Sequence, residues 1–220
     1  MFLFVILLVV TGFFAYFCGN LNSRIIASDL VYHRNLYGYP QNNQGLSALL
    51  HDYDVKKHVG FAAVIILRAA IPILVGGWLM LICDAKTIGR VFAMFCFLLG
   101  QIFPFFYRFK GQPSSIAFLL AALFANFELG IVAIIVFAVV YVFTRYISLS
   151  TIVSALFVFI LSIIAVDIPC VHWLYLACFA LVLIDYRRSL PRLIKKTEPK
   201  YTFKRELSYM FDDKRSKPRQ

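Results

Sequence analysis

The stretch SIAFLLAALFANFELGIVAIIVFAVVYVFT, at residues 115–144, decides how many helices the sequence predicts. It is apolar throughout except for an interruption at Asn126, Glu128 and Gly130. A helix needs roughly 20 apolar residues to cross a bilayer, so the stretch could form one long helix or two shorter ones. The choice determines on which side of a membrane every later residue lies.

Further apolar segments lie on both sides of this stretch. With 61% hydrophobic and only 15% charged residues, the chain is far more apolar than a soluble domain. The composition predicts an all-α, polytopic membrane helix bundle of about seven transmembrane helices. The apolar segments are 1–18, 59–83, 88–106, 115–127, 129–144, 150–166 and 170–184.

The Lys and Arg residues favour two helices over one in the deciding stretch. A break near Glu128 puts 19 of the 22 Lys and Arg on one side of the membrane, and cytoplasmic loops are the ones enriched in these residues. We therefore expect the N-terminus outside and the C-terminus inside, with Asp84 and Asp167 on outside connections. We expect two parts, a membrane-spanning domain at 1–190 and a basic cytoplasmic tail at 191–220.

The net charge of +11 belongs mainly to this tail, since twelve of the 22 Lys and Arg follow Tyr186. Basic segments beside a membrane helix usually contact anionic headgroups, so we expect membrane lipid as a partner and no nucleic acid. The five cysteines form no CxxC pair and the four histidines show no metal-binding spacing, so we expect no metal and no cofactor. Sequence motifs of soluble hydrolases, nucleotide-binding proteins and zinc proteases are absent.

Polar groups gather at the expected cytoplasmic border, where cations and small polar side chains could bind phosphate. The alternative is that these Lys and Arg only anchor helix ends. Arg68 argues against that alternative, because it lies well inside an apolar segment, where a charge costs roughly 2.5 to 3.5 kcal/mol. Asp185, Glu198 or a ligand phosphate could pair with it, although its side chain could also extend toward the membrane surface.

Three motifs in this order resemble those of the bacterial acyl-phosphate:glycerol-3-phosphate acyltransferases. GQIFPFFYRFKG at 100–111 is similar to a family run that begins Gly-His-x-x-Pro and ends Phe-Lys-Gly-Gly-Lys-Gly. DYRRSLPRLIKKTEPK at 185–200 is similar to Arg-His-Arg-x-Asn-Ile-x-Arg-Leu followed by Thr-Glu-x-Lys. PQNNQGLSA at 40–48 is a weaker match to a Gly-Ser-Gly-Asn loop, and Arg68 falls where the family has a membrane-embedded Lys.

The resemblance implies an enzyme of the bacterial cell membrane with seven helices and an outside N-terminus. Its substrates would be glycerol 3-phosphate and acyl phosphate, its product lysophosphatidic acid for phospholipid synthesis, and it would use no coenzyme A. We expect the substrate and phosphate groups to bind Asn43, Ser47, Arg68, Lys110, Arg187, Ser189 and Arg192. No residue is assigned as catalytic.

Several residues depart from the family pattern. Family histidines are replaced by Gln101 and Tyr186, a lysine by Pro113, an asparagine by Ser189, and the Gly-Ser-Gly by residues 40–42. We therefore expect weak acyl transfer, because these positions hold phosphates and align the attacking hydroxyl in the family. The alternatives are a non-catalytic relative that binds a phosphorylated lipid or a partner protein, and a small transporter or channel.

Overall fold

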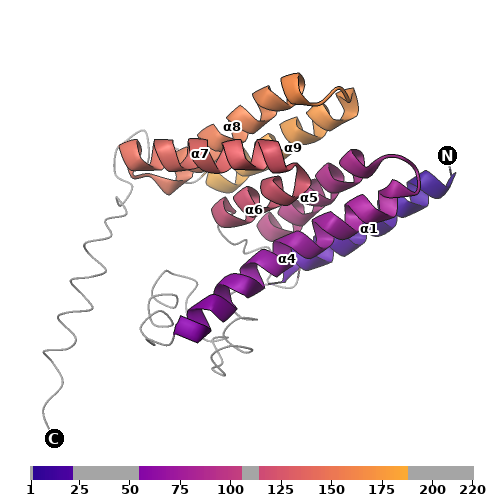
Figure 1. The fold of residues 1–220 in the computed structure, drawn as a ribbon, viewed down its shortest axis with the longest axis horizontal. Coiled ribbons are helices and arrows are strands. Elements are labelled where there is room, and N and C mark those ends of the chain that lie inside the picture. Colours follow the sequence, from indigo (N-terminus) through magenta and orange to yellow (C-terminus); the bar gives the residue numbers. More distant parts are fainter. Residues whose placement is uncertain (1, 22–54, 106–113, 188–220) are drawn as a thin grey trace, which may run out of the picture.

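The computed structural model describes residues 2–21, 55–105 and 114–187, and these ranges contain seven α-helices. Figure 1 shows the helices lying side by side, in two adjoining groups of antiparallel neighbours. In chain order the helices are α1 (Phe2–Asn20), α4 (Val55–Leu81), α5 (Lys86–Ile102), α6 (Ser115–Ala125), α7 (Phe127–Thr144), α8 (Ile147–Ala165) and α9 (Pro169–Tyr186). The all-α prediction is confirmed.

The deciding stretch forms two helices, α6 and α7, which separate at Asn126. The extended backbone of Asn126 ends α6, and its side chain accepts hydrogen bonds from the backbone N–H groups of Glu128 and Leu129 to cap α7. The Glu128 carboxylate lies in the first turn of α7, where the helix dipole favours negative charge. The predicted break is confirmed, and a polar side chain that caps the next helix is its cause.

Gly130 lets the two helices fold back tightly on each other. A Cβ atom at this position would lie 2.2 Å from the Cα atom of Leu123 in α6. No side chain can occupy that space, so the hairpin depends on glycine one turn after the break.

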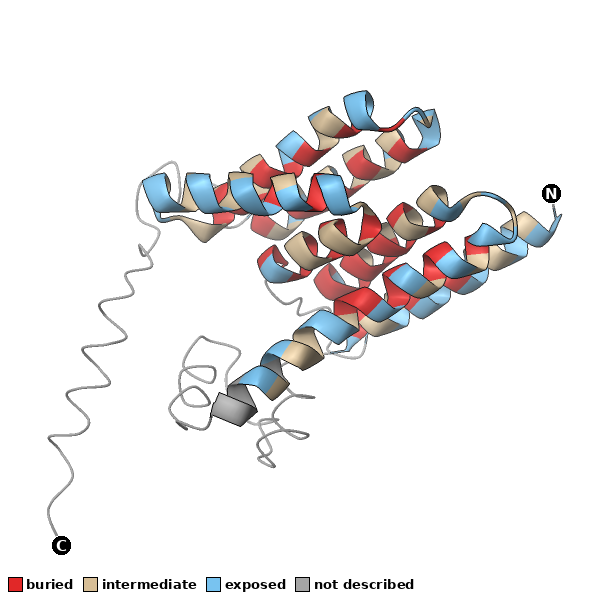
Figure 2. Ribbon diagram, viewed as in Figure 1, coloured by how far each residue is buried: buried red, intermediate tan, exposed pale blue. Residues whose placement is uncertain are grey.

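Five of the helices are long and apolar enough to cross a membrane: α1, residues Ala62–Leu81 of α4, α7, α8 and α9. Many residues on the outer faces of these helices are exposed (Figure 2), and they include large apolar ones such as Phe143, which is 84% exposed. Such a surface suits lipid tails and not water. The shorter α5 and α6 lie among the others, so the count of seven membrane crossings stays a prediction.

Helix α5 forms the centre of one half of the bundle, where it packs against α1, α4, α6 and α9. Its buried side chains include Met94, Phe97 and Leu98. Glycines let the backbones approach: a Cβ at Gly19 of α1 would lie 2.1 Å from the Phe97 carbonyl oxygen, and one at Gly100 would lie 2.3 Å from that of Tyr16. Small residues at such crossings are typical of helix packing in membranes, where close van der Waals contact drives association.

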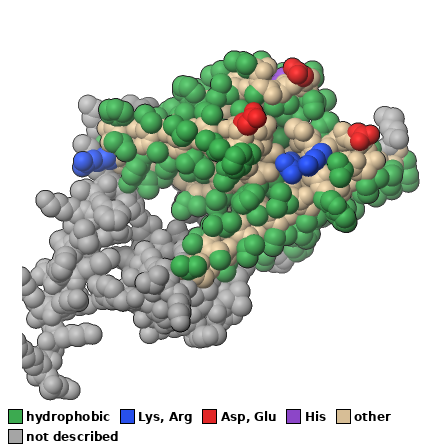
Figure 3. Space-filling view, in the orientation of Figure 1, with side chains coloured by type: hydrophobic (Ala, Val, Ile, Leu, Met, Phe, Trp, Pro, Cys, Tyr) green, Lys and Arg blue, Asp and Glu red, His purple; other side chains and the backbone are tan. Residues whose placement is uncertain are grey.

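The ends of the bundle differ in their charged residues. Asp84 follows α4, Glu128 begins α7 and Asp167 lies between α8 and α9, so the alternating direction of the helices puts these acids on the same side of the bundle. Lys86 and Arg90 at the start of α5 share that end. Arg145 and Arg187 follow α7 and α9 at the opposite end, which we expect to face the cytoplasm. On the face drawn in Figure 3, acidic and basic side chains form a few separate patches among hydrophobic ones.

Cysteine labelling tests this orientation. In a variant whose five native cysteines are replaced by alanine, an impermeant maleimide should modify Asp84→Cys and Asp167→Cys in intact cells. Arg145→Cys should react only after the membrane is permeabilised, because its helix end lies on the cytoplasmic side. Labelling of position 145 in intact cells, with positions 84 and 167 protected, would reverse the topology.

Candidate functional site

Arg68, in the middle of α4, turns its guanidinium group toward the C-terminal end of α1. Its Nε donates a hydrogen bond to the Cys18 carbonyl at 3.0 Å, and its Nη2 donates one to the Gly19 carbonyl at 2.6 Å. The last carbonyls of a helix lack partners within the helix and form the negative end of its dipole. A cation placed there is stabilised, which explains how the bundle tolerates a charge in α4.

Two groups of α5 complete the surroundings of the arginine. Nη2 also donates a hydrogen bond to Oε1 of the buried Gln101, and the guanidinium lies over the Phe97 ring, 5.4 Å from its centroid. These contacts hold Arg68 within the bundle, near the end at which α1 and α5 terminate, and the extension of its side chain toward the membrane surface stays untested. Its partners include two backbone carbonyls and a glutamine, which the sequence did not suggest, while Glu198 lies outside the described residues.

The same place contains further polar groups of α1 and of the end of α5. The hydroxyl of Tyr16 donates a hydrogen bond to the Phe103 carbonyl at 2.9 Å, which holds the end of α5 against α1. Asn20 is 1% exposed, and its Oδ1 has no hydrogen-bond partner among the described residues. A buried acceptor without a donor is uncommon in folded proteins, so Asn20 has capacity for a further hydrogen bond at this place.

A second polar contact joins the start of α6 to the end of α9. Oδ2 of Asp185 accepts hydrogen bonds from the backbone N–H of Ser114 at 3.2 Å and from its hydroxyl at 2.6 Å. The hydroxyl groups of Ser115 and Tyr186 form a buried hydrogen bond next to it. The carboxylate thereby caps α6 from another helix, because negative charge is favoured at a helix N-terminus.

This contact, which we call the α6–α9 clasp (Ser114, Ser115, Asp185 and Tyr186), adjoins both cationic motifs of the sequence. Lys110 lies in the connection that ends at Ser114, and Arg187 follows Tyr186 directly. The clasp therefore joins the start of α6, which follows the first motif in the sequence, to Asp185 and Tyr186, which begin the other motif. Sequence reasoning missed both serines, although a Ser-Ser pair before an apolar run is a recognisable helix start.

Two of the seven predicted site residues lie in the part of the chain that the structure describes. Arg68 points into the bundle, and Arg187 is exposed at the end of α9. Both lie toward the end of the bundle at which α1, α5 and α9 terminate. Outside the described residues are Asn43, Ser47, Lys110, Ser189 and Arg192. A common phosphate site for all seven stays a prediction.

Comparison with known proteins identifies the family. The family model for glycerol-3-phosphate acyltransferase matches residues 8–196, a range that contains all the polar groups described above. The chain belongs to the glycerol-3-phosphate acyltransferase family. The resemblance drawn from the sequence motifs is confirmed.

Individual glycerol-3-phosphate acyltransferases are similar to this chain in sequence or in fold. The glycerol-3-phosphate acyltransferase of Finegoldia magna is 28% identical over 197 residues, covering 88% of this chain and 96% of the relative. That of Francisella philomiragia is 30% identical over 193 residues, covering 85% and 89%. The crystal structure of PlsY, an integral membrane glycerol 3-phosphate acyltransferase in its glycerol 3-phosphate form, superposes with a TM-score of 0.69 at 18% identity. It covers 91% of this chain and 98% of that one, so the fold is shared.

The two histidine replacements in this acyltransferase have clear structural roles. Gln101 holds Arg68, and Tyr186 binds Ser115 within the α6–α9 clasp. A glutamine side chain does not titrate, and a tyrosine ordinarily ionises near pH 10, so neither is a good proton acceptor at neutral pH. The positions at which the resemblance places histidines thus serve helix packing in this chain.

The Arg68 contacts predict a measurable effect on stability. Arg68→Met should lower the free energy of unfolding by about 2 to 4 kcal/mol, because it leaves buried acceptors on α1 and α5 without a donor. Arg187→Met, an exposed arginine at a helix end, should change it by less than about 0.5 kcal/mol. Thermal unfolding of both variants in detergent compares them. Equal losses in the two variants would show that Arg68 has no special structural role.

Proposed function

We propose that this protein transfers an acyl group from acyl phosphate to the 1-hydroxyl of glycerol 3-phosphate, giving lysophosphatidic acid for phospholipid synthesis. The reaction would take place at the cytoplasmic face of the bacterial cell membrane. The observation that carries the proposal is Arg68, a cation fixed inside an apolar bundle within the range that the acyltransferase family model matches. Structures of PlsY in its glycerol 3-phosphate and lysophosphatidic acid forms share the fold.

The reaction requires the protein mainly to position its two substrates. The 1-hydroxyl oxygen attacks the acyl carbonyl carbon, the bond from that carbon to the phosphate oxygen breaks, and inorganic phosphate leaves while the hydroxyl proton passes to phosphate or water. An acyl phosphate is already activated, so the reaction needs no protein nucleophile and no cofactor. Holding two anions together and stabilising the developing charge can supply much of the acceleration.

Arginines and lysine suit this task. Arg68, Lys110, Arg187 and Arg192 would bind the two phosphates, while the amide of Asn43 and the hydroxyls of Ser47 and Ser189 would complete the hydrogen bonds. Three acceptors of Arg68, the carbonyls of Cys18 and Gly19 and the amide of Gln101, orient its guanidinium group. A cation that is already in place needs no reorganisation when the transition state forms.

The same contacts favour slow turnover. Loss of a general base typically lowers a rate by about 10² to 10⁴-fold, and Gln101 and Tyr186 cannot provide one efficiently. The wild-type protein should still make lysophosphatidic acid, because the cations and the activated donor remain.

Incubation of the purified protein with hexadecanoyl phosphate and radiolabelled glycerol 3-phosphate tests the proposal directly. Labelled lysophosphatidic acid should appear only with both substrates, and Lys110→Ala should abolish it. If the protein forms no product while glycerol 3-phosphate still binds in a Lys110-dependent manner, the protein is a non-catalytic binder and the proposal fails.

A triple variant tests why turnover is slow. Pro113→Lys, Tyr186→His and Ser189→Asn together should raise the rate at least about tenfold, because they restore a cation, an imidazole and an amide that the family resemblance places there. Tyr186→Phe is the matched control, since it removes the hydroxyl from the α6–α9 clasp without adding a base. A rate in the triple variant no higher than in the wild type would contradict the explanation.

A further inference from the structure

Asn20, the last residue of α1, has an unused hydrogen-bond acceptor next to the Arg68 contacts. Its side chain is 1% exposed, and its Oδ1 atom has no hydrogen-bond partner among the described residues. It directly follows Gly19, whose carbonyl binds Arg68. A Cβ atom at Gly100, the residue before Gln101, would lie 3.0 Å from the Asn20 backbone nitrogen, so α5 passes close to it. Asn20 therefore belongs to the place where α1, α4 and α5 meet.

The other acceptors described at this place already have a donor. The carbonyls of Cys18 and Gly19 and the Oε1 atom of Gln101 accept hydrogen bonds from Arg68. A buried acceptor without a donor destabilises a fold, and it gains more from a ligand hydroxyl than an acceptor that is already bound. Oδ1 of Asn20 is thus the acceptor at this place that a ligand with a hydrogen-bond donor would satisfy.

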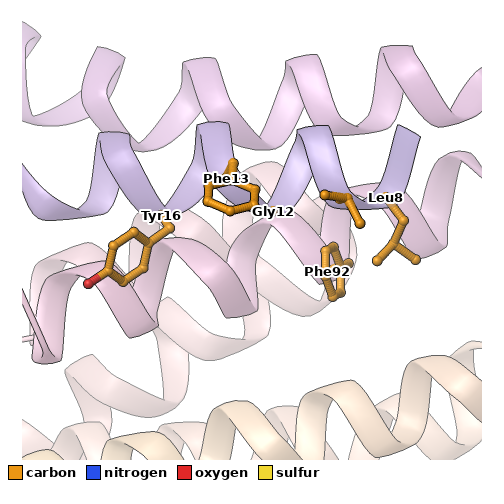
Figure 4. Close-up of a pocket in the computed structure, with 6 residues that line it drawn as sticks. Leu8, Gly12, Phe13, Tyr16 and Phe92 are labelled. Atoms are coloured by element: carbon orange, nitrogen blue, oxygen red, sulfur yellow. The ribbon is translucent and has the colours of Figure 1, made fainter. Parts of the chain in front are cut away.

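Tyr16 marks the point at which the interface between α1 and α5 changes from apolar to polar. On one side of it lies an apolar pocket, whose lining includes Leu8 of α1 and Phe92 of α5 (Figure 4). The hydroxyl of Tyr16 points away from these two side chains and donates a hydrogen bond to the Phe103 carbonyl. Asn20 lies one helical turn after Tyr16, on the same face of α1. A polar ligand group is therefore suited to the Asn20 side of Tyr16.

We propose that Oδ1 of Asn20 accepts a hydrogen bond from the 2-hydroxyl group of glycerol 3-phosphate, an inference that rests on the proposed function. The phosphate of this substrate pairs with cations such as Arg68, whereas its two hydroxyl groups need acceptors. An amide oxygen accepts a hydrogen bond but takes no proton at neutral pH. It suits the hydroxyl that stays intact, and not the 1-hydroxyl, which loses its proton during attack. Asn20 thereby favours an acyl acceptor with a second hydroxyl group.

A substrate without the 2-hydroxyl provides the test. 3-Hydroxypropyl phosphate has the reacting hydroxyl and the phosphate of glycerol 3-phosphate and differs only in lacking that group. With hexadecanoyl phosphate as donor, kcat/KM of the wild type should be at least about tenfold higher for glycerol 3-phosphate, because the analogue leaves a buried acceptor unpaired. In Asn20→Leu, which has a side chain of similar size and no acceptor, the two values should differ by less than about twofold.

This ratio separates substrate recognition from helix packing, since it does not depend on the fraction of the protein that folds. Asn20→Asp keeps an acceptor and should keep the preference, although its negative charge weakens the binding of both phosphates. Thr11→Val is the matched control, because it removes an equally buried oxygen without a described partner from the same helix, about 14 Å from Asn20 along the axis. It should leave the ratio unchanged. If Asn20→Leu lowers kcat/KM equally for both substrates, Asn20 serves packing and the inference is overturned.

Binding without turnover distinguishes this inference from the proposed function. The calorimetric dissociation constants of glycerol 3-phosphate and 3-hydroxypropyl phosphate should differ about tenfold in the wild type and less than about twofold in Asn20→Leu, even if no product forms. If the wild type uses both substrates with equal kcat/KM, the proposed function stands and the inference is overturned. If neither compound binds or reacts, both proposals fail.

Discussion

Hydrogen bonds from Arg68 of α4 to the last carbonyls of α1 and to Gln101 of α5 join the three helices around which the site is built. A charged side chain inside an apolar helix is costly, and the negative end of the α1 dipole together with Gln101 of α5 offsets that cost. The contact is possible only because Gly19 and Gly100 let α1 and α5 approach so closely that their C-terminal ends meet beside α4. Packing of small residues therefore determines where the cation lies.

The α6–α9 clasp joins two helices through polar side chains, as the Arg68 contacts join α4, α1 and α5. Asp185 satisfies the N-terminus of α6, which follows the connection that contains Lys110, and Tyr186 closes the contact just before Arg187. Since α9 also packs against α5, the two polar contacts share one helix neighbour. Among the described residues, Arg68 and Arg187 thus lie toward the same end of the bundle although they are far apart in sequence, which suits the proposed binding of two phosphates.

The sequence predicted the fold well because apolar length and charge distribution are strong signals for membrane helices. It also predicted the break at residues 126–130, since Asn126 and Gly130 have local reasons to interrupt a helix. The carbonyl partners of Arg68 could not be predicted from the sequence, because every residue has a backbone carbonyl. Neither could the hydrogen bonds between Ser114 and Asp185, which are 71 residues apart in the sequence and are brought together by helix packing.

A double-mutant cycle between Arg68 and Gln101 tests most directly whether one contact organises both the bundle and the site. Arg68→Lys, Gln101→Leu and the double variant would be compared for the free energy of unfolding and for the dissociation constant of glycerol 3-phosphate. The account predicts coupling of about 1 kcal/mol or more in both quantities, because the two side chains act as one unit. Additive effects in both, within about 0.3 kcal/mol, would contradict it.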